Sequence, residues 1–326
     1  MSDLKEQKKK ESLKKFKKEY PRTNQGLLDR VHGYHYLKYI NLYIHYMQNA
    51  LNGLKPIPDD LKYPDDKDYL DAEDAVKMFV DQTGFIASNM ETNEYHAKVI
   101  RVEDAKKILS LHEDLNLPDL PKTVIPYNLA RKAIIKDPES IAVVECPCRE
   151  ARGDAGCYPR EVCLILGEPW VSFVLDYVSD TKARRVTQKE ALEIVQDQHE
   201  RGNVQSAFFK SSLNDRLYAI CNCCTCCCTA MSAYNLLDAP MFASSGYKCS
   251  VDEEKCVSCG ICVDYCKFNA MQMVDDKMVF DSAKCLGCGV CESKCTSGAI
   301  SIIRDDPSIC EPLDVDVLIP KYTPRA

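Results

Sequence analysis

The sequence predicts an α+β protein with a helical N-terminal region, a mixed α/β middle region rich in cysteine, and a small C-terminal unit. Three observations across the 326 residues support this prediction. Apolar residues recur at the helical period near the N-terminus, short apolar runs lead into cysteines in the middle, and a 29-residue repeat occupies the C-terminal part. All twenty cysteines lie between Cys146 and Cys310. We therefore expect the first 145 residues to serve as a platform for a partner or a dimer.

We expect the chain to divide into five segments. These are a basic N-terminal segment (1–24), a helical partner or dimer domain (25–137), a cysteine-rich α/β domain (138–245), a repeat domain (246–312) and a tail (313–326). The net charge of −7 is distributed unevenly, because residues 1–22 carry nine Lys or Arg against four Asp or Glu. We expect this segment to be a helix that docks on the body of the protein through Leu13, Phe16 and Tyr20. The alternative is peripheral contact with anionic lipid. No basic and aromatic pattern follows, so nucleic acid is not an expected partner.

The segment from 25 to 137 is expected to be helical. Its clearest signal is an apolar series at the helical period: Leu37, Ile40, Tyr43, Ile44, Met47 and Leu51. Further helices are predicted at 71–80, 102–114 and 127–137. Three histidines lie in the tyrosine-rich part: His32, His35 and His45. Because no CxxCH or HExxH motif accompanies them, a tyrosine-rich core is favoured over a haem or metal site.

In the middle region, two short apolar runs lead directly into cysteines. Ser140–Glu145 precedes Cys146, and Arg216–Ile220 precedes Cys221. If both runs are strands of one sheet, their ends bring the two cysteine sets to a common edge. Between them, Thr187 and Glu190 form a capping box that predicts the start of a helix. Trp170, the one tryptophan, is expected to anchor the core after a turn.

The cysteines are better explained by metal binding than by disulfides. Six of the eight residues from Cys221 to Cys228 are cysteine, and neighbouring Cα atoms lie only about 3.8 Å apart, which is shorter than a disulfide prefers. The N-terminus has no apolar signal-peptide core, and no stretch of 18 apolar residues occurs. We therefore expect metal–thiolate sites in a reducing, anaerobic cytoplasm, without a transmembrane segment.

The strongest signal is the repeated CxxCxxCxxxC motif. Its eight cysteines are Cys256, Cys259, Cys262 and Cys266, followed by Cys285, Cys288, Cys291 and Cys295. Three closely spaced thiolates wrap a loop around one [4Fe–4S] cube, whereas the fourth reaches the other cube. One cluster is then held by Cys256, Cys259, Cys262 and Cys295, and the other by Cys285, Cys288, Cys291 and Cys266. Paired zinc ribbons are the disfavoured alternative.

Residues 248–305 resemble the bacterial two-cluster ferredoxin family on the strength of this motif. The resemblance implies a ferredoxin-like domain that transfers single electrons at low potential. One departure is that Lys267 and Thr296 stand where the family has a proline after the fourth cysteine of each motif. Since that proline carries no ligand, cluster binding is still expected.

Ten further cysteines form a second expected metal-binding region. They are Cys146, Cys148, Cys157, Cys163, Cys221, Cys223, Cys224, Cys226, Cys227 and Cys228. A subset of them is expected to hold one or two more [4Fe–4S] clusters, with a structural zinc site as the alternative. Arg149 is expected either to be a cation beside an anionic cluster or to form an ordinary salt bridge. Asn222 is expected either to donate a hydrogen bond to sulfur or to be a turn residue. Cys249 and Cys310 are expected to be buried small residues or spare ligands.

The Cys-Pro-Cys-Arg and Cys-Asn-Cys-Cys segments are similar to those of larger anaerobic iron–sulfur proteins. We therefore predict an electron-transfer protein that relays low-potential electrons to or from a partner oxidoreductase. The alternative is an oxidoreductase whose middle cluster acts on a thiol, a disulfide or another small substrate, with catalytic residues unidentified. Nucleotide-binding and hydrolase motifs are absent from the sequence. A redox protein is the expected partner, and a homo-oligomer is left open.

Overall fold

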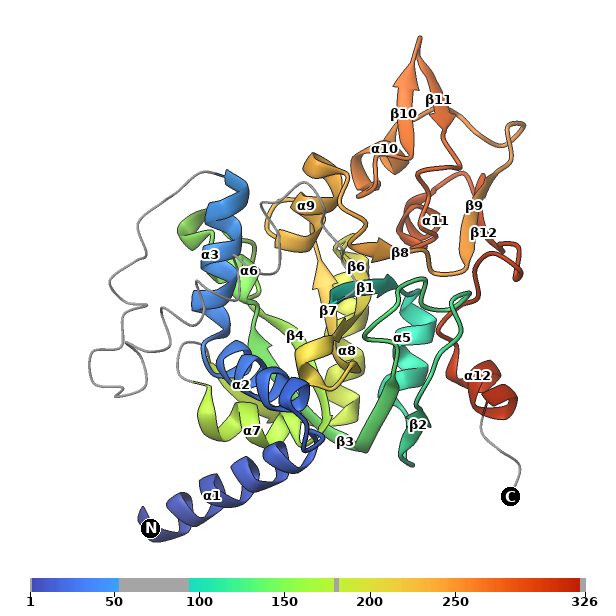
Figure 1. Ribbon diagram of the computed structural model, residues 1–326. Coiled ribbons are helices and arrows are strands. Elements are labelled where there is room, and N and C mark those ends of the chain that lie inside the picture. Colours follow the sequence, from blue (N-terminus) through green and yellow to red (C-terminus); the bar gives the residue numbers. More distant parts are fainter. Residues whose placement is uncertain (1, 53–93, 179–181, 323–326) are drawn as a thin grey trace.

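The computed structural model describes residues 2–52, 94–178 and 182–322 (Figure 1). At its centre lies a sheet with strand order β2-β3-β4-β7-β6-β1-β8, in which β5 also pairs with β3. The strands are β1 (Tyr95–Val99), β2 (Leu115–Leu117), β3 (Ala133–Glu145), β4 (Glu161–Glu168), β5 (Ala183–Val186), β6 (Val204–Lys210), β7 (Arg216–Cys223) and β8 (Phe242–Ala243). Neighbouring strands are antiparallel except β1 and β8. The predicted α+β class is confirmed.

The arrangement of β3, β4 and β7 brings distant cysteines to one edge of the sheet. Both β3 and β7 run antiparallel to β4 and are therefore parallel to each other. Cys146 follows β3 directly and Cys221 lies near the carboxyl end of β7, at the same edge as the beginning of β4, where Cys163 pairs with Val144. The predicted convergence of the two apolar runs is confirmed.

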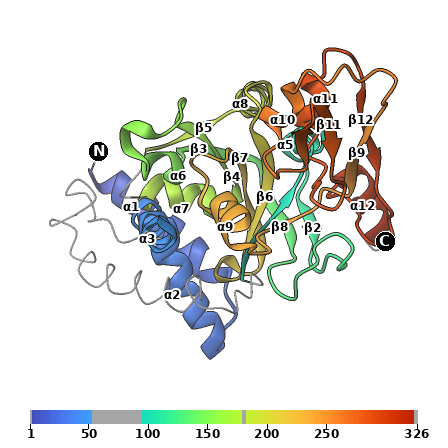
Figure 2. The same ribbon diagram turned by 90° about the horizontal axis from the view of Figure 1, so that it is seen from above.

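Helices cover both faces of the sheet (Figure 2). One face carries α1 (Ser2–Lys18), α2 (Asn24–Lys38), α3 (Ile40–Asn52), α7 (Trp170–Tyr177) and α9 (Thr229–Leu237). The other face carries α5 (Val102–Leu109), α8 (Gln188–Glu200) and α12 (Val315–Tyr322). Each face buries its own apolar cluster against the sheet. The cysteines at the sheet edge belong to the first of these clusters.

Several local predictions for the helices are confirmed. Phe16 is fully buried, stacks on Phe173 and meets the edge of Trp170, so the N-terminal helix docks on the body. Trp170 is itself fully buried and anchors the core. Thr187 caps α8 by accepting a hydrogen bond from the Glu190 backbone N–H.

The C-terminal unit is a small pseudo-symmetric domain. Its parts are β9 (Tyr247–Val251) paired with β12 (Ile300–Arg304), the hairpin of β10 (Met271–Val274) and β11 (Lys277–Phe280), α10 (Ile261–Tyr265) and α11 (Val290–Lys294). Each half of the repeat ends in a strand, β10 after the first motif and β12 after the second. Phe268 docks the domain on the body, because its buried ring contacts Tyr234 and Phe242.

The expectation of helix throughout 25–137 is wrong for parts of 94–137, where β1, β2 and the beginning of β3 lie. β1 pairs with β6, and the helix predicted at 127–137 is replaced by a loop that leads into β3 at Ala133. The alternation of buried and less buried residues at Ala133, Ile134 and Ile135 shows the reason, since sheet pairing overrides helical propensity there. The helix predicted at 102–114 ends early, at Leu109. The one predicted at 71–80 lies outside the described residues, and the domain boundaries stay predictions.

Within the described ranges, no helix combines the length and the apolar character needed to span a bilayer. Two short 3-10 helices complete the described elements: η2 (Gly153–Ala155) follows α6 (Pro147–Glu150), and η3 (Ser211–Leu213) links β6 to β7.

Candidate metal centres

The two cysteine motifs of the C-terminal domain have matching backbone geometry. Each wraps into a loop that ends in a short helix, and the helix begins after a glycine with a positive φ, +78° at Gly260 and +82° at Gly289. A side chain would strain this conformation. The fourth cysteine of each motif accepts a backbone N–H, from Ala270 to Cys266 Sγ at 3.2 Å and from Ala299 to Cys295 Sγ at 3.3 Å.

The thiols of the two motifs lie close enough to shift one another's pKa values. Burial raises the pKa of Cys288, and the nearby Cys291, Cys266 and Cys285 raise it further. Burial likewise raises the pKa of Cys262 to about 11, with contributions from Cys291 and then from Cys256 and Cys259. Cys266 therefore lies beside the second motif although it belongs to the first.

The sequence of this domain matches a known family. Residues 255–299 match the family model of the 4Fe-4S dicluster domain. The C-terminal unit is therefore a ferredoxin-like dicluster domain, as the repeat predicted. No curated protein matches the chain.

Outside the dicluster domain, six thiols form a ring at the sheet edge. We call Cys146, Cys148, Cys163, Cys221, Cys223 and Cys228 the thiol ring. Electrostatic interactions between neighbouring thiols connect its members in the order Cys223, Cys228, Cys148, Cys146, Cys163 and Cys221. Cys221 and Cys223 close the ring because residues two apart on β7 point to the same face.

The ring surrounds a small space within the core. The cavity has a volume of about 50 Å³ and is lined by all six ring thiols, with walls from α3, β6 and α9. One water needs roughly 10–15 Å³ by this measure, so the cavity has room for a small polyatomic group. Soft thiol donors around such a space fit an iron–sulfur cluster.

Arg149 supplies the cationic group that this site needs. Its side chain is almost fully buried and lines the cavity. Its guanidinium donates to the backbone oxygens of Pro159 and Asn222 and to Gln198 Oε1. Burial lowers its pKa, but nearby thiols, first Cys146, raise it by more. The Nε–H is buried and has no hydrogen-bond partner among the described residues, which suits an anionic occupant of the cavity.

The pKa values of the ring thiols are shifted in different directions. Hydrogen bonds from Cys146 and Cys228 lower the pKa of Cys148, whereas the hydrogen bond to Cys148 raises that of Cys146. The Thr229 hydroxyl, 3.4 Å from Cys148 Sγ, also favours the thiolate. Cys148 is therefore the thiol of this pair that ionises first, and a thiolate is the form that binds metal.

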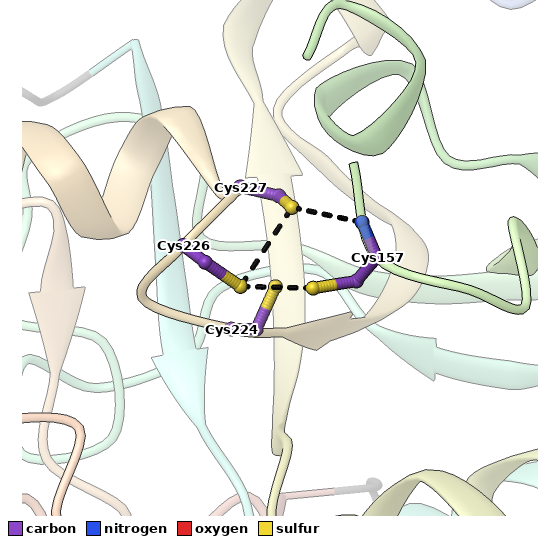
Figure 3. Close-up of side chains that lie close together, drawn as sticks. All are labelled: Cys157, Cys224, Cys226 and Cys227. Carbon is purple, nitrogen blue, oxygen red and sulfur yellow. Dashed lines mark hydrogen bonds between the residues drawn. The ribbon is translucent and has the colours of Figure 1, made fainter. Parts of the chain in front are cut away.

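The remaining four of the ten cysteines form a separate group, which we call the tetrad. It consists of Cys157, Cys224, Cys226 and Cys227, whose Sγ atoms all lie within 4.8 Å of one another (Figure 3). Cys157 comes from the loop between η2 and β4, and the other three come from the turn between β7 and α9. Hydrogen bonds from Cys227 and Cys226 lower the pKa of Cys224 to about 5.

The structure also assigns places to the other residues singled out from the sequence. Asn222 donates to the Val162 carbonyl and accepts from Gln205, so its side chain ties strands together rather than binding sulfur. The Cys249 backbone N–H donates to Cys285 Sγ at 3.5 Å, which places this cysteine beside the dicluster thiols. Cys310 accepts a hydrogen bond from buried Lys98.

Two contributions to the thiol sites were missed from the sequence. Gln48 on α3 donates to the carbonyls of both Cys148 and Cys227, and thereby joins ring and tetrad. Tyr36, Tyr95 and Tyr218 line the cavity, and the Tyr36 and Tyr218 hydroxyls are 2.7 Å apart. The abundance of tyrosine in the N-terminal segment was the available signal, but sequence alone could not place these rings beside cysteines far along the chain.

Proposed function

We propose that this chain is a multi-cluster iron–sulfur protein that relays low-potential electrons to or from a partner oxidoreductase. The dicluster domain carries the proposal, because two [4Fe–4S] clusters in one small domain are suited to single-electron transfer. In this proposal Cys256, Cys259, Cys262 and Cys295 hold the first cluster. Cys285, Cys288, Cys291 and Cys266 hold the second.

We further propose that the thiol ring holds an additional iron–sulfur cluster. Its six thiols, the cavity that they line and the buried Arg149 support this assignment. A cation beside the sulfurs raises the potential of a cluster. The ring would therefore lie at a higher potential than the dicluster domain, where the described residues include no buried lysine or arginine.

The packing supports an order for electron transfer. Phe268, two residues after Cys266, contacts Tyr234 on α9, and this helix begins directly after the ring residue Cys228. Asn235 on the same helix donates to the Lys267 carbonyl at 3.1 Å. Cys288 packs against the core that contains the ring. The second cluster site is thus the inner one, and the first, with exposed Cys259, faces solvent.

The outer end of the dicluster domain suits contact with a basic redox partner. Val257 is 67% exposed beside the exposed carboxylates Glu253 and Glu254. Asp275 and Asp276, at the tip of the β10–β11 hairpin, are also exposed. Complementary charge speeds association at low ionic strength.

Stopped-flow reoxidation tests this proposal directly. The protein is purified and reduced anaerobically, then mixed with a basic one-electron acceptor, cytochrome c, or with a neutral dye of similar potential. Fast reoxidation by cytochrome c that slows as salt increases is expected, with little salt dependence for the dye. A protein that shows no reversible reduction signal by EPR would contradict the electron-transfer role.

An enzymatic role of the ring is the second candidate. It is favoured by the number of ring thiols, which exceeds the four that one cubane needs. Burial argues for the carrier role, since Cys146, Cys163, Cys223 and Cys228 are each less than 9% exposed. EPR of the reduced protein with and without a small disulfide separates the two, because a substrate would perturb the ring signal only in an enzyme.

A further inference from the structure

The tetrad differs in geometry from the other cysteine groups of the chain. Cys157 Sγ lies 2.9 Å from Cys226 Sγ, and Cys226 Sγ lies 3.7 Å from Cys227 Sγ. In the parts of the chain that the structure describes, no other set of three or more cysteine, histidine or carboxylate ligand atoms is gathered within 4.8 Å. All twenty cysteines belong to those parts, so the thiol ring and both dicluster sets are more widely spaced.

This difference separates two kinds of metal site. Four thiolates around a single tetrahedral ion, each about 2.3 Å from it, lie about 3.8 Å from one another. In a cubane each thiolate binds a different iron at a different corner, so the sulfurs are held further apart. The tetrad has the compact spacing of a mononuclear site, whereas the dicluster cysteines of the same chain have the wider spacing.

We propose that Cys157, Cys224, Cys226 and Cys227 bind one zinc ion as a closed structural site. Four thiolates complete the tetrahedral coordination of zinc and leave no position for substrate. Zinc is favoured over ferrous iron at a mononuclear thiolate site by the usual order of divalent metal affinities. Nothing in this assignment depends on the proposed electron transfer.

The position of the tetrad gives the zinc ion a structural role. Cys224 and Cys227 also line the cavity of the thiol ring, and Cys226 is exposed at the surface. The Cys157 backbone N–H donates to Cys227 Sγ at 3.4 Å, a contact that orients a metal-binding thiolate. The ion would join the loop before β4 to the turn after β7, and so close the ring cavity at its outer side.

Paired substitutions test the assignment. Cys226 and Cys259 are the two cysteines classed as exposed, one in the tetrad and one in the dicluster domain. Protein purified anaerobically without added metal is expected to contain about one zinc per chain. Cys226→Ser should lower zinc at least fivefold and leave iron unchanged. The matched control, Cys259→Ser, should lower iron and leave zinc unchanged.

Zinc-edge X-ray absorption of the wild-type protein provides a test that does not depend on the folding of a variant. The expected result is four sulfur neighbours at about 2.3 Å and no iron neighbour. The proposal is wrong if wild-type protein lacks zinc, if Cys226→Ser loses iron in place of zinc, or if alkylation and mass spectrometry find a Cys157–Cys226 disulfide.

Discussion

The dicluster domain and the cysteine-rich core both bring thiols together, but one does so within a short segment and the other across distant segments. In the dicluster domain all eight motif cysteines lie within the 40 residues from Cys256 to Cys295, and the domain's own apolar cluster has only four buried residues. In the core, the ring and tetrad draw on residues from Cys146 to Cys228 and on several strands and helices. The ring is part of the largest apolar cluster of the protein. Metal binding should therefore be a local property of the dicluster domain and a global property of the core.

The largest expected effect comes from removal of ring thiols. The triple substitution Cys148→Ser, Cys163→Ser and Cys228→Ser leaves three ring thiols, one fewer than a fully thiolate-ligated cubane needs. Iron should fall from about 12 to about 8 atoms per chain, and the thermal midpoint should fall with it. Iron analysis and calorimetry check this. The control is Cys310→Ser, a buried cysteine outside the ring, which should retain full iron.

The second prediction concerns Arg149, a buried cation that lies beside the thiol ring and not in the dicluster domain. Arg149→Gln removes a buried cation that neighbouring thiols stabilise, and should destabilise the protein by roughly 4 kcal/mol. It should also lower the potential of one cluster, the one in the ring, and leave the dicluster potentials unchanged. An EPR-monitored redox titration measures both. Arg149→Lys, which keeps the charge, should restore most of the potential. Equal shifts at all clusters would contradict the placement of Arg149.

Phe268 tests the contact between the two regions. Its ring is 4% exposed and lies between Tyr234 and Phe242, with centroid separations of 5.7 and 5.9 Å. Phe268→Ala should cost roughly 3 kcal/mol through lost packing and make the linker before β9 easier to cleave by protease. The control is Met273→Ala on the exposed hairpin, which should change neither property. Unchanged cleavage of Phe268→Ala would mean that this contact does not hold the regions together.

The smallest expected effect concerns Lys210, a buried lysine in the core. Burial lowers its pKa to about 8, although the carboxylates of Glu94 and Asp29 raise it slightly. The loss of stability from burying the charge is fully present below pH 8. It decreases between pH 8 and 10.5, because the folded protein has then released a proton that the unfolded chain retains. The rings of Tyr36, Tyr43 and Tyr95 offset part of it.

Lys210→Met should therefore gain stability relative to wild type at pH 7 and lose that advantage by pH 10. The difference between the two pH values should be roughly 1–3 kcal/mol. Urea unfolding of both proteins at each pH measures it, and comparison with wild type cancels the titration of the thiols. A difference that does not change with pH would show that Lys210 keeps its charge.

The difference between local and long-range gathering of thiols also explains how much of each region could be predicted from the sequence. The dicluster domain could be predicted in detail because its spacing, its glycines and its strands are local signals. The meeting of Cys146 and Cys221 could also be predicted, because two apolar runs both end in cysteine. The division of the ten core cysteines into ring and tetrad could not. It depends on which face of β7 carries Cys221 and Cys223, and on the distant Cys157 reaching the turn after β7.

The wrong helix at 127–137 has a related cause. Ile134 and Ile135 fit either a helix or a strand, and the choice is made by pairing with β2, which is itself only three residues long. The tyrosines and Gln48 of the N-terminal helices were likewise invisible as contributors to the thiol sites. The role of Gln48 comes from packing of α3 on α6 and α9, and that of Tyr36 on α2 comes from its contact with Tyr218 on β7, rather than from any local pattern.

We propose that this chain binds three iron–sulfur clusters and one zinc ion in two differently built regions. The most direct test is the iron, acid-labile sulfide and zinc content of protein purified without exposure to oxygen. About 12 iron, about 12 sulfide and about one zinc per chain are expected. A result of about 8 iron and 8 sulfide would contradict a cluster in the thiol ring and confine the redox sites to the dicluster domain.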